Sequence, residues 1–250
     1  IAITGPGLID GTKGLVRNAG YGGGRRGATG PDGTLPPGSA PAPVSVTPPG
    51  PPPPGAPAAG GPGPGPRSPV GQGNKAIGLR NCRNVTLRDF SVLNGGHFAL
   101  LATGVDHLTL DNLKVDTNRD GFDIDACRNV RVSNCSVNAL NDDAIVLKSS
   151  YGLGEARATE NVTITNCLVS GFDAGSLLDG TYRRTLERAP DRDGPTGRIK
   201  FGTESNGGFR NITISNCVFD RSRGLALETV DGGGIEDVVI SNLTMRDVSN

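Results

Sequence analysis

The chain has 250 residues, of which 25 are Lys or Arg and 25 are Asp or Glu, so its formal net charge at pH 7 is zero. A neutral chain has no overall field that would steer it toward nucleic acid or an anionic membrane surface, and we expect neither as a partner. No apolar run approaches the roughly 20 residues that a membrane-spanning helix needs, which argues against such a helix.

Residues 1–34 open the chain with one predicted early rung, Ile1–Ile9, followed by a Gly-rich stretch, GYGGGRRG. No helix with Lys-Ser or Lys-Thr follows the glycines, so we interpret the stretch as a flexible loop and not as a phosphate-binding loop. Residues 35–72 hold most of the 19 prolines, mixed with Gly and Ala. This composition predicts a linker or a disordered excursion without a catalytic role.

Residues 73–250 are built on a nine-residue phrase that recurs six times. The copies are NVTLRDFSV at 84–92, HLTLDNLKV at 107–115, NVRVSNCSV at 129–137, NVTITNCLV at 161–169, NITISNCVF at 211–219 and DVVISNLTM at 237–245. The shortest distances between successive starts are 22 and 23 residues, so the base period is close to 22. Because the chain starts inside a predicted strand and the last copy nearly reaches Asn250, we expect the repeat to continue beyond both ends.

Each phrase alternates apolar and polar residues around a central Asn or Asp, which predicts two short strands joined by a sharp corner. Asn and Asp tolerate the left-handed backbone that such a corner needs. The corner residues are Asp89, Asn112, Asn134, Asn166, Asn216 and Asn242. A period near 22, rich in β-branched residues, predicts an all-β parallel β-helix in which each rung pairs with its neighbours. A leucine-rich repeat is the alternative, although its spaced-Leu consensus is not seen.

Three of the five cysteines, Cys135, Cys167 and Cys217, occupy the same position of successive phrases. We therefore expect them to stack inside the solenoid as small core residues. The sequence has no CxxC motif and no Cys/His ligand spacing, so no metal or other cofactor is predicted.

A further strand is expected between phrases, at Phe122–Asp125, Ala144–Lys148, Arg198–Gly202 and Leu225–Thr229. Acidic turns precede the first two, NRDG at 118–121 and NDD at 141–143. Asp120 and Asp142 are one period apart, so Asp120, Asp142 and Asp143 are predicted to converge in one groove. Clustered carboxyls push their pKa values apart, as acid and base catalysis requires. The alternative is that Asp and Asn are simply good turn residues.

Glycoside hydrolysis with inversion needs a pair of carboxyls about 6.5–9.5 Å apart, so that a water fits between them. The sequence NRDGFDI, followed one rung later by NDDAIVLKS, resembles the signature of the polygalacturonases, glycoside hydrolase family 28. The resemblance covers about Lys75 to Asn250. It implies a right-handed parallel β-helix, secreted or periplasmic, that hydrolyses a pectic or related acidic polysaccharide with inversion. Asp142 would be the general acid, while Asp120 and Asp143 would hold and deprotonate the attacking water.

The chain departs from this family in its cations. The family's Gly-His-Gly should fall near Gly197–Ile199, where this chain has no His, and its Arg-Ile-Lys should fall at Ala226–Glu228. An Arg-Ile-Lys string stands one rung earlier and is expected to supply displaced cationic contacts. The predicted substrate-binding residues are His97, Asn118, Lys148, Arg198, Lys200, Glu204 and Glu228. The two glutamates would bond neutral hydroxyls or pair with the cations, and either role favours a branched, decorated or different pectic sugar.

Two other functions stay open at this point. A polysaccharide lyase also uses a parallel β-helix, with acidic calcium ligands and Arg198 or Lys200 as the base. A non-catalytic carbohydrate-binding solenoid fits the missing histidine and the displaced cations. In each case we expect a monomer whose partner is a polysaccharide or oligosaccharide. The irregular stretch Thr181–Gly197 is expected to line or cap the groove.

Overall fold

The computed structural model describes residues 1–15, 74–185 and 195–249. The chain divides into two units, residues 1–17 with 68–250, and residues 18–67. The second unit lies outside the described residues, as do the predicted Gly-rich loop and the predicted Pro-rich segment 35–72. The architecture below is that of the first unit. In its described part, no helix is long and apolar enough to cross a membrane.

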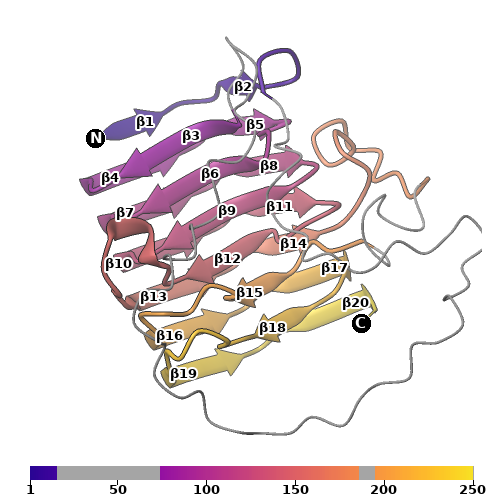
Figure 1. Ribbon diagram of the computed structural model, residues 1–250. Coiled ribbons are helices and arrows are strands. Elements are labelled where there is room, and N and C mark those ends of the chain that lie inside the picture. The colour runs from indigo at the N-terminus through magenta and orange to yellow at the C-terminus, as the bar shows by residue number, and fades with distance from the viewer. Residues whose placement is uncertain (16–73, 186–194, 250) are drawn as a thin grey trace, which may run out of the picture. The chain divides into compact units, whose positions relative to one another are not determined.

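Three parallel sheets run side by side along the first unit (Figure 1). The first sheet contains β1 (Ala2–Thr4), β4 (Arg83–Arg88), β7 (Asp106–Asp111), β10 (Arg128–Ser133), β13 (Thr159–Thr165), β16 (Phe209–Ser215) and β19 (Ile235–Ser241). The second contains β2 (Leu8–Asp10), β5 (Ser91–Leu93), β8 (Lys114–Thr117), β11 (Ser136–Ala139), β14 (Leu168–Ser170), β17 (Val218–Ser222) and β20 (Thr244–Val248). The third contains β3 (Lys75–Arg80), β6 (Phe98–Thr103), β9 (Asp120–Asp125), β12 (Ile145–Lys148), β15 (Ile199–Phe201) and β18 (Leu225–Leu227).

Neighbours in every sheet are three strands apart in the chain, so each rung gives one strand to each sheet, except that the last described rung has only β19 and β20. This is a parallel β-helix, and the predicted fold class is confirmed. The leucine-rich repeat alternative is wrong, because all three segments of a rung are strands, whereas a leucine-rich repeat has one strand and a helical or irregular return. The only helix in the described ranges is the single turn of 3₁₀-helix η1 (Tyr151–Leu153).

The corners of the repeat have the predicted backbone. All six central Asn and Asp residues have positive φ, between 49° and 67°. The first residue of each phrase is also left-handed, with φ between 50° and 59°, a second corner that the sequence reasoning missed. These residues are Asn84, His107, Asn129, Asn161, Asn211 and Asp237. Each phrase is therefore a strand bounded by two left-handed residues and followed by a second strand.

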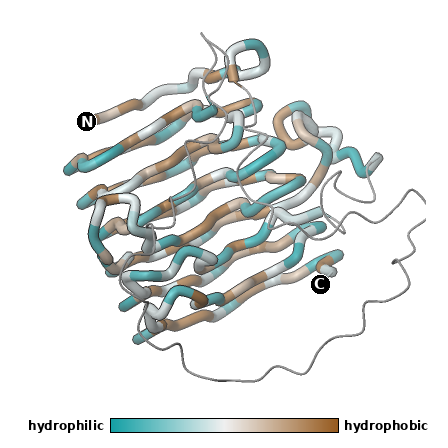
Figure 2. The backbone as a smooth tube through the Cα atoms, in the orientation of Figure 1, coloured by the Kyte–Doolittle hydropathy of each residue, from teal (hydrophilic) through white to brown (hydrophobic). Residues whose placement is uncertain are grey.

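Apolar side chains of the three sheets meet inside the coil and form one core. Figure 2 shows hydrophobic and hydrophilic positions interleaved along the strands, as the period of two requires. Cys135, Cys167 and Cys217 are buried in this core, which confirms their predicted stacking. The structure describes all five cysteines, and each is a free thiol.

A row of alternating charges crosses the first sheet. One residue from each of six successive strands stands in register, with signs that alternate from rung to rung. The row is Arg83, Asp106, Arg128, Glu160, Arg210 and Glu236. Arg128 Nε lies 2.9 Å from Glu160 Oε1, and Arg210 Nε lies 3.6 Å from Glu236 Oε2. Exposed pairs contribute at most about 1 kcal/mol each, but like charges in register would repel, so the row favours this rung register.

The loop after β14 is tied to the solenoid by one buried carboxylate, that of Asp116 at the end region of β8. It accepts backbone hydrogen bonds from Gly175 and Leu177 at 2.8 Å and from Leu178 at 3.0 Å. Asn138 Nδ2 donates a fourth hydrogen bond at 2.9 Å. The predicted irregular stretch 181–197 is the continuation of this loop, and its central residues, 186–194, lie outside the described part.

Candidate functional site

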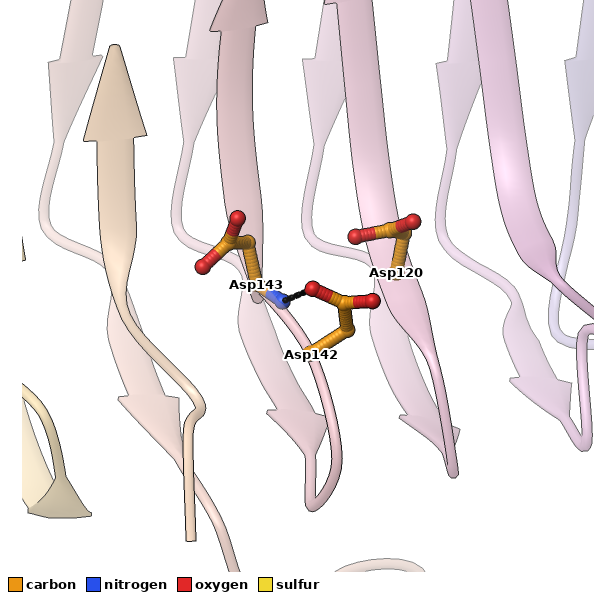
Figure 3. Close-up of side chains that lie close together, drawn as sticks. All are labelled: Asp120, Asp142 and Asp143. Carbon is orange, nitrogen blue, oxygen red and sulfur yellow. Dashed lines mark hydrogen bonds between the residues drawn. The ribbon is translucent and has the colours of Figure 1, made fainter. Parts of the chain in front are cut away.

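The acidic turns of two neighbouring rungs stack on each other. Asp120 begins β9, and Asp142 and Asp143 lie in the turn before β12. Gly121 N donates to Asp143 O at 3.0 Å, which joins the two rungs at the acids themselves. A side chain on Gly121 would overlap the carbonyl oxygen of Ala144, so this glycine is required by the close approach of the rungs. Figure 3 shows the three carboxylates gathered at this point.

One oxygen from each of Asp120, Asp142 and Asp143 lies within 4.8 Å of the others. Asp143 N donates to Asp142 Oδ1 at 3.2 Å, the dashed line in Figure 3. The predicted convergence of the three residues is therefore present. These nearest oxygens are closer together than the separation of about 6.5–9.5 Å between carboxyl groups that we expected for inversion.

Guanidinium groups neutralise two of the three acids. Arg119 Nη2 lies 2.5 Å from Asp142 Oδ2, and Arg198 Nε forms a close ion pair with Asp143 Oδ1. Lys200 Nζ lies 4.0 Å from the other oxygen of Asp143. The sequence reasoning missed Arg119. Its position between Asn118 and Asp120 was a signal, but a turn sequence does not reveal which way a side chain points.

Burial raises the pKa of two of the three acids. It raises the pKa of Asp120 well above its usual range, and the nearby charge of Asp142 raises it further. Burial also raises the pKa of Asp143, although Arg198 opposes that shift. The arrangement therefore favours a proton on Asp120 beside ion-paired neighbours. His97, a predicted substrate contact, has its Nε2 3.9 Å from Asp120 Oδ2 and lies at this site as expected.

Two lysines lie along the same sheet face, each between acidic groups. Lys148 Nζ is 3.0 Å from Asp123 Oδ2 and 3.4 Å from Glu204 Oε2. Burial lowers the pKa of Lys148, but the charges of Asp123, Asp120 and Glu204 outweigh it and raise that pKa above its usual value. Asp123 was also missed. Burial raises its pKa to about 6 against the opposing charge of Lys148.

The second lysine, Lys200, connects the acid cluster to the next rung. Its Nζ lies 3.1 Å from Glu228 Oε2 and donates to Thr203 Oγ1 at 3.0 Å. Thr203 Oγ1 in turn donates to Glu228 at 3.3 Å. The predicted residues Arg198, Lys200 and Glu228 are thus brought to the acids in a continuous chain of contacts.

Asn118 is placed differently from the other predicted contacts. Its Oδ1 accepts a close hydrogen bond from Asn141 Nδ2 of the next rung, so its side chain holds the two acidic turns together. It also lines a cavity of about 300 Å³ beside the acids. The lining residues are Gly11, Thr12, Leu15, Asn94, Gly96, Thr117, Asn118 and Arg119.

Access to the acids is narrow. The side chains of Asp120, Asp142 and Asp143 are 7 %, 12 % and 7 % exposed. A sugar can therefore touch only the exposed edges of these carboxylates in the conformation described. The three acids are close enough to hold a cation, but Arg119, Arg198 and Lys200 already supply positive charge to them, so we assign no metal.

The family model described as "Right handed beta helix region" matches residues 69–189, which include both acidic turns. The chain is a right-handed parallel β-helix. No curated protein matches the sequence. The β-helix fold is shared by polysaccharide hydrolases, polysaccharide lyases and non-catalytic proteins, so the choice among functions depends on the site.

Proposed function

We propose that this β-helix is a glycoside hydrolase that acts on a pectic or related polysaccharide through Asp120, Asp142 and Asp143. One observation carries the proposal: three carboxylates from adjacent rungs meet within 4.8 Å, and two of them, Asp142 and Asp143, are ion-paired with arginines while Asp120 is not. A protonated acid beside ionised carboxylates is what glycosidic hydrolysis requires. The resemblance to polygalacturonases, carried by NRDG and NDD, points to the same three residues.

In this proposal Asp120 is the proton donor. The resemblance gives that role to Asp142, but Arg119 lies 2.5 Å from Asp142, and an arginine ion pair suits an ionised carboxylate. Burial and the charge of Asp142 raise the pKa of Asp120 well above its usual range, whereas Arg198 opposes the rise in the pKa of Asp143. It would give its proton to the glycosidic oxygen of the leaving sugar.

Asp142 and Asp143 would hold and deprotonate the attacking water. Two oxygens no more than 4.8 Å apart can both accept hydrogen bonds from one water, because each O–H···O bond spans about 2.7–2.8 Å. Direct attack by this water would invert the anomeric centre, as the resemblance implies, although the nearest oxygens of the three acids are closer together than the carboxyl separation typical of inverting enzymes. ¹H NMR of the first-formed anomer of the product decides between inversion and retention.

The test is the release of reducing ends from homogalacturonan, rhamnogalacturonan and xylogalacturonan by the wild type and by Asp120→Asn, Asp142→Asn and Asp143→Asn. Each substitution should lower activity on the best substrate by roughly 100-fold or more. Asp237→Asn is the matched control, because the equivalent first residue of four other phrases is already Asn. Unchanged activity in all three acid variants, with an active wild type, would overturn the proposal.

A polysaccharide lyase is less well supported by the contacts. Its candidate bases, Arg198 and Lys200, both lie against Asp143, and a guanidinium or ammonium held by a carboxylate is a poor proton acceptor. A lyase would leave an unsaturated product that absorbs in the ultraviolet and would lose activity on chelation of calcium. The hydrolase proposal expects neither result.

A further inference from the structure

Two cations of the candidate site, Lys148 and Lys200, are less exposed than the glutamates that they contact. The side chains of Glu204 and Glu228 are 45 % and 36 % exposed, whereas their partners Lys148 and Lys200 are 19 % and 9 % exposed. Each glutamate contacts its lysine, at 3.4 and 3.1 Å. A ligand that approaches this face of the third sheet therefore meets carboxylates before it meets ammonium groups.

The net charge of the candidate site is also not positive. Its carboxyl groups are those of Asp120, Asp123, Asp142, Asp143, Glu204 and Glu228. Its permanent cations are those of Arg119, Lys148, Arg198 and Lys200. Even with a proton on Asp120 and a charged His97, the sum reaches only zero. A site without net positive charge offers no net electrostatic attraction to a uronate carboxylate.

We infer that the sugar residue bound along Glu204 and Glu228 is uncharged and is recognised through hydroxyl groups that donate to these two carboxylates. Ionised carboxylates only accept hydrogen bonds, so adjacent sugar hydroxyls suit them, while a uronate would meet like charge. The inference rests on the proposed function only in placing a carbohydrate at this site. It narrows the substrate to a polysaccharide with neutral residues at this position.

The experiment is isothermal titration calorimetry on the Asp142→Asn variant, so that binding is measured without turnover. The ligands are oligosaccharides from homogalacturonan, rhamnogalacturonan and xylogalacturonan, each in its acidic form and in its fully methyl-esterified form. The two forms share rings and linkages and differ in charge. In at least one of the three series, the esterified form should bind about tenfold or more tightly than the acidic form.

A charge substitution makes the test specific to the glutamates. Glu228→Gln, added to the Asp142→Asn variant, removes one exposed negative charge and the nearer of the two carboxylates that contact Lys200, so the acidic form should gain about tenfold in affinity relative to the esterified form. Glu236→Gln on β19 is the matched control, because that glutamate belongs to the first sheet and should leave the ratio unchanged.

Tighter or equal binding of the acidic form in every series that binds would overturn the inference, and so would an unchanged ratio in the Glu228→Gln protein. Failure of every ligand to bind would overturn it as well. These outcomes are separate from the hydrolase test, because they are read from binding to a protein that already lacks one proposed catalytic carboxylate. A protein that binds neutral sugars without cleaving any would contradict the proposed function and leave this inference standing.

Discussion

Asp120→Asn should remove the proton donor and leave the rest of the site intact. Asn has nearly the size of Asp, and the ion pairs Arg119–Asp142 and Arg198–Asp143 do not involve the replaced group. A general acid contributes roughly 100- to 10,000-fold to the rate, which corresponds to about 3–5 kcal/mol of transition-state stabilisation. We expect a loss of this size on natural glycosides, whose leaving oxygen needs a proton.

The assay that isolates this role uses a glycosyl fluoride of the preferred sugar, because fluoride leaves without protonation. On this substrate Asp120→Asn should recover most of the wild-type rate. Asp142→Asn and Asp143→Asn should stay inactive, because the proposed water still lacks one of its two acceptors. The acid variants can lose equal activity on the natural substrate. The informative measurement is therefore the difference between each variant's activity on the fluoride and its activity on the natural substrate.

The opposite pattern would refute the reasoning. Recovery of Asp142→Asn on the fluoride, with Asp120→Asn remaining inactive, would return the acid role to Asp142, as the family resemblance implies. It would also mean that the Arg119 ion pair opens when substrate binds. The folded state of each variant is checked by circular dichroism, with Asp237→Asn as the reference.

Three further predictions concern stability. The pKa of Asp123 is raised from 3.8 to about 6, so its ionisation should cost the folded state on the order of 3 kcal/mol as pH rises through this window. The Tm of the wild type should therefore fall between pH 4 and 6, and the Tm of the Asp123→Asn variant should fall less. Asp116→Ala should speed hydrogen exchange of the backbone amides at 175–178 and lower the free energy of unfolding by about 3 kcal/mol, whereas Asp179→Ala on the exposed part of the loop should leave those amides protected. Asn166→Ala at a left-handed corner should cost about 1–2 kcal/mol in urea unfolding, and Asn166→Gly should cost less.

The fold was predictable because the repeated phrase marks both the corners of each rung and the side chains that face the core. The central Asn or Asp of each phrase marks a left-handed corner, and the apolar residues around it mark the inward face. The period of 22 between Asp120 and Asp142 was enough to predict that their turns would stack. The second left-handed corner was missed, because its occupant varies from Asn to His107 and Asp237 and was counted as part of the strand.

The composition of the site was less predictable than its location. Arg119 and Asp123 reach the site from positions that the sequence presents as a turn residue and a strand residue, and only packing decides their direction. The spacing of the acids was also beyond the sequence, because a period gives the rung but not the distance between side-chain oxygens. The pairing of Glu204 and Glu228 with lysines was one of two alternatives, and the contacts favour pairing.

Backbone hydrogen bonds between rungs hold the three acids close together, where their carboxylates repel one another. Asn141 N donates to Asn118 O at 3.0 Å, and Gly197 N donates to Asp142 O at 2.9 Å, so three rungs hold the acidic turns in place. These bonds fix the backbone of the acidic turns, and the guanidinium groups of Arg119 and Arg198 offset part of the repulsion between the carboxylates. Loss of Arg119 or Arg198 should therefore lower Tm, and so should loss of Asp142 or Asp143, because each change removes one partner of a largely buried ion pair. Asp120→Asn should leave Tm unchanged or raise it, because it removes a buried carboxyl whose pKa burial raises. All of these substitutions should reduce turnover, so the contrast in Tm between Asp120→Asn and the other variants distinguishes acids held in buried ion pairs from ordinary turn residues.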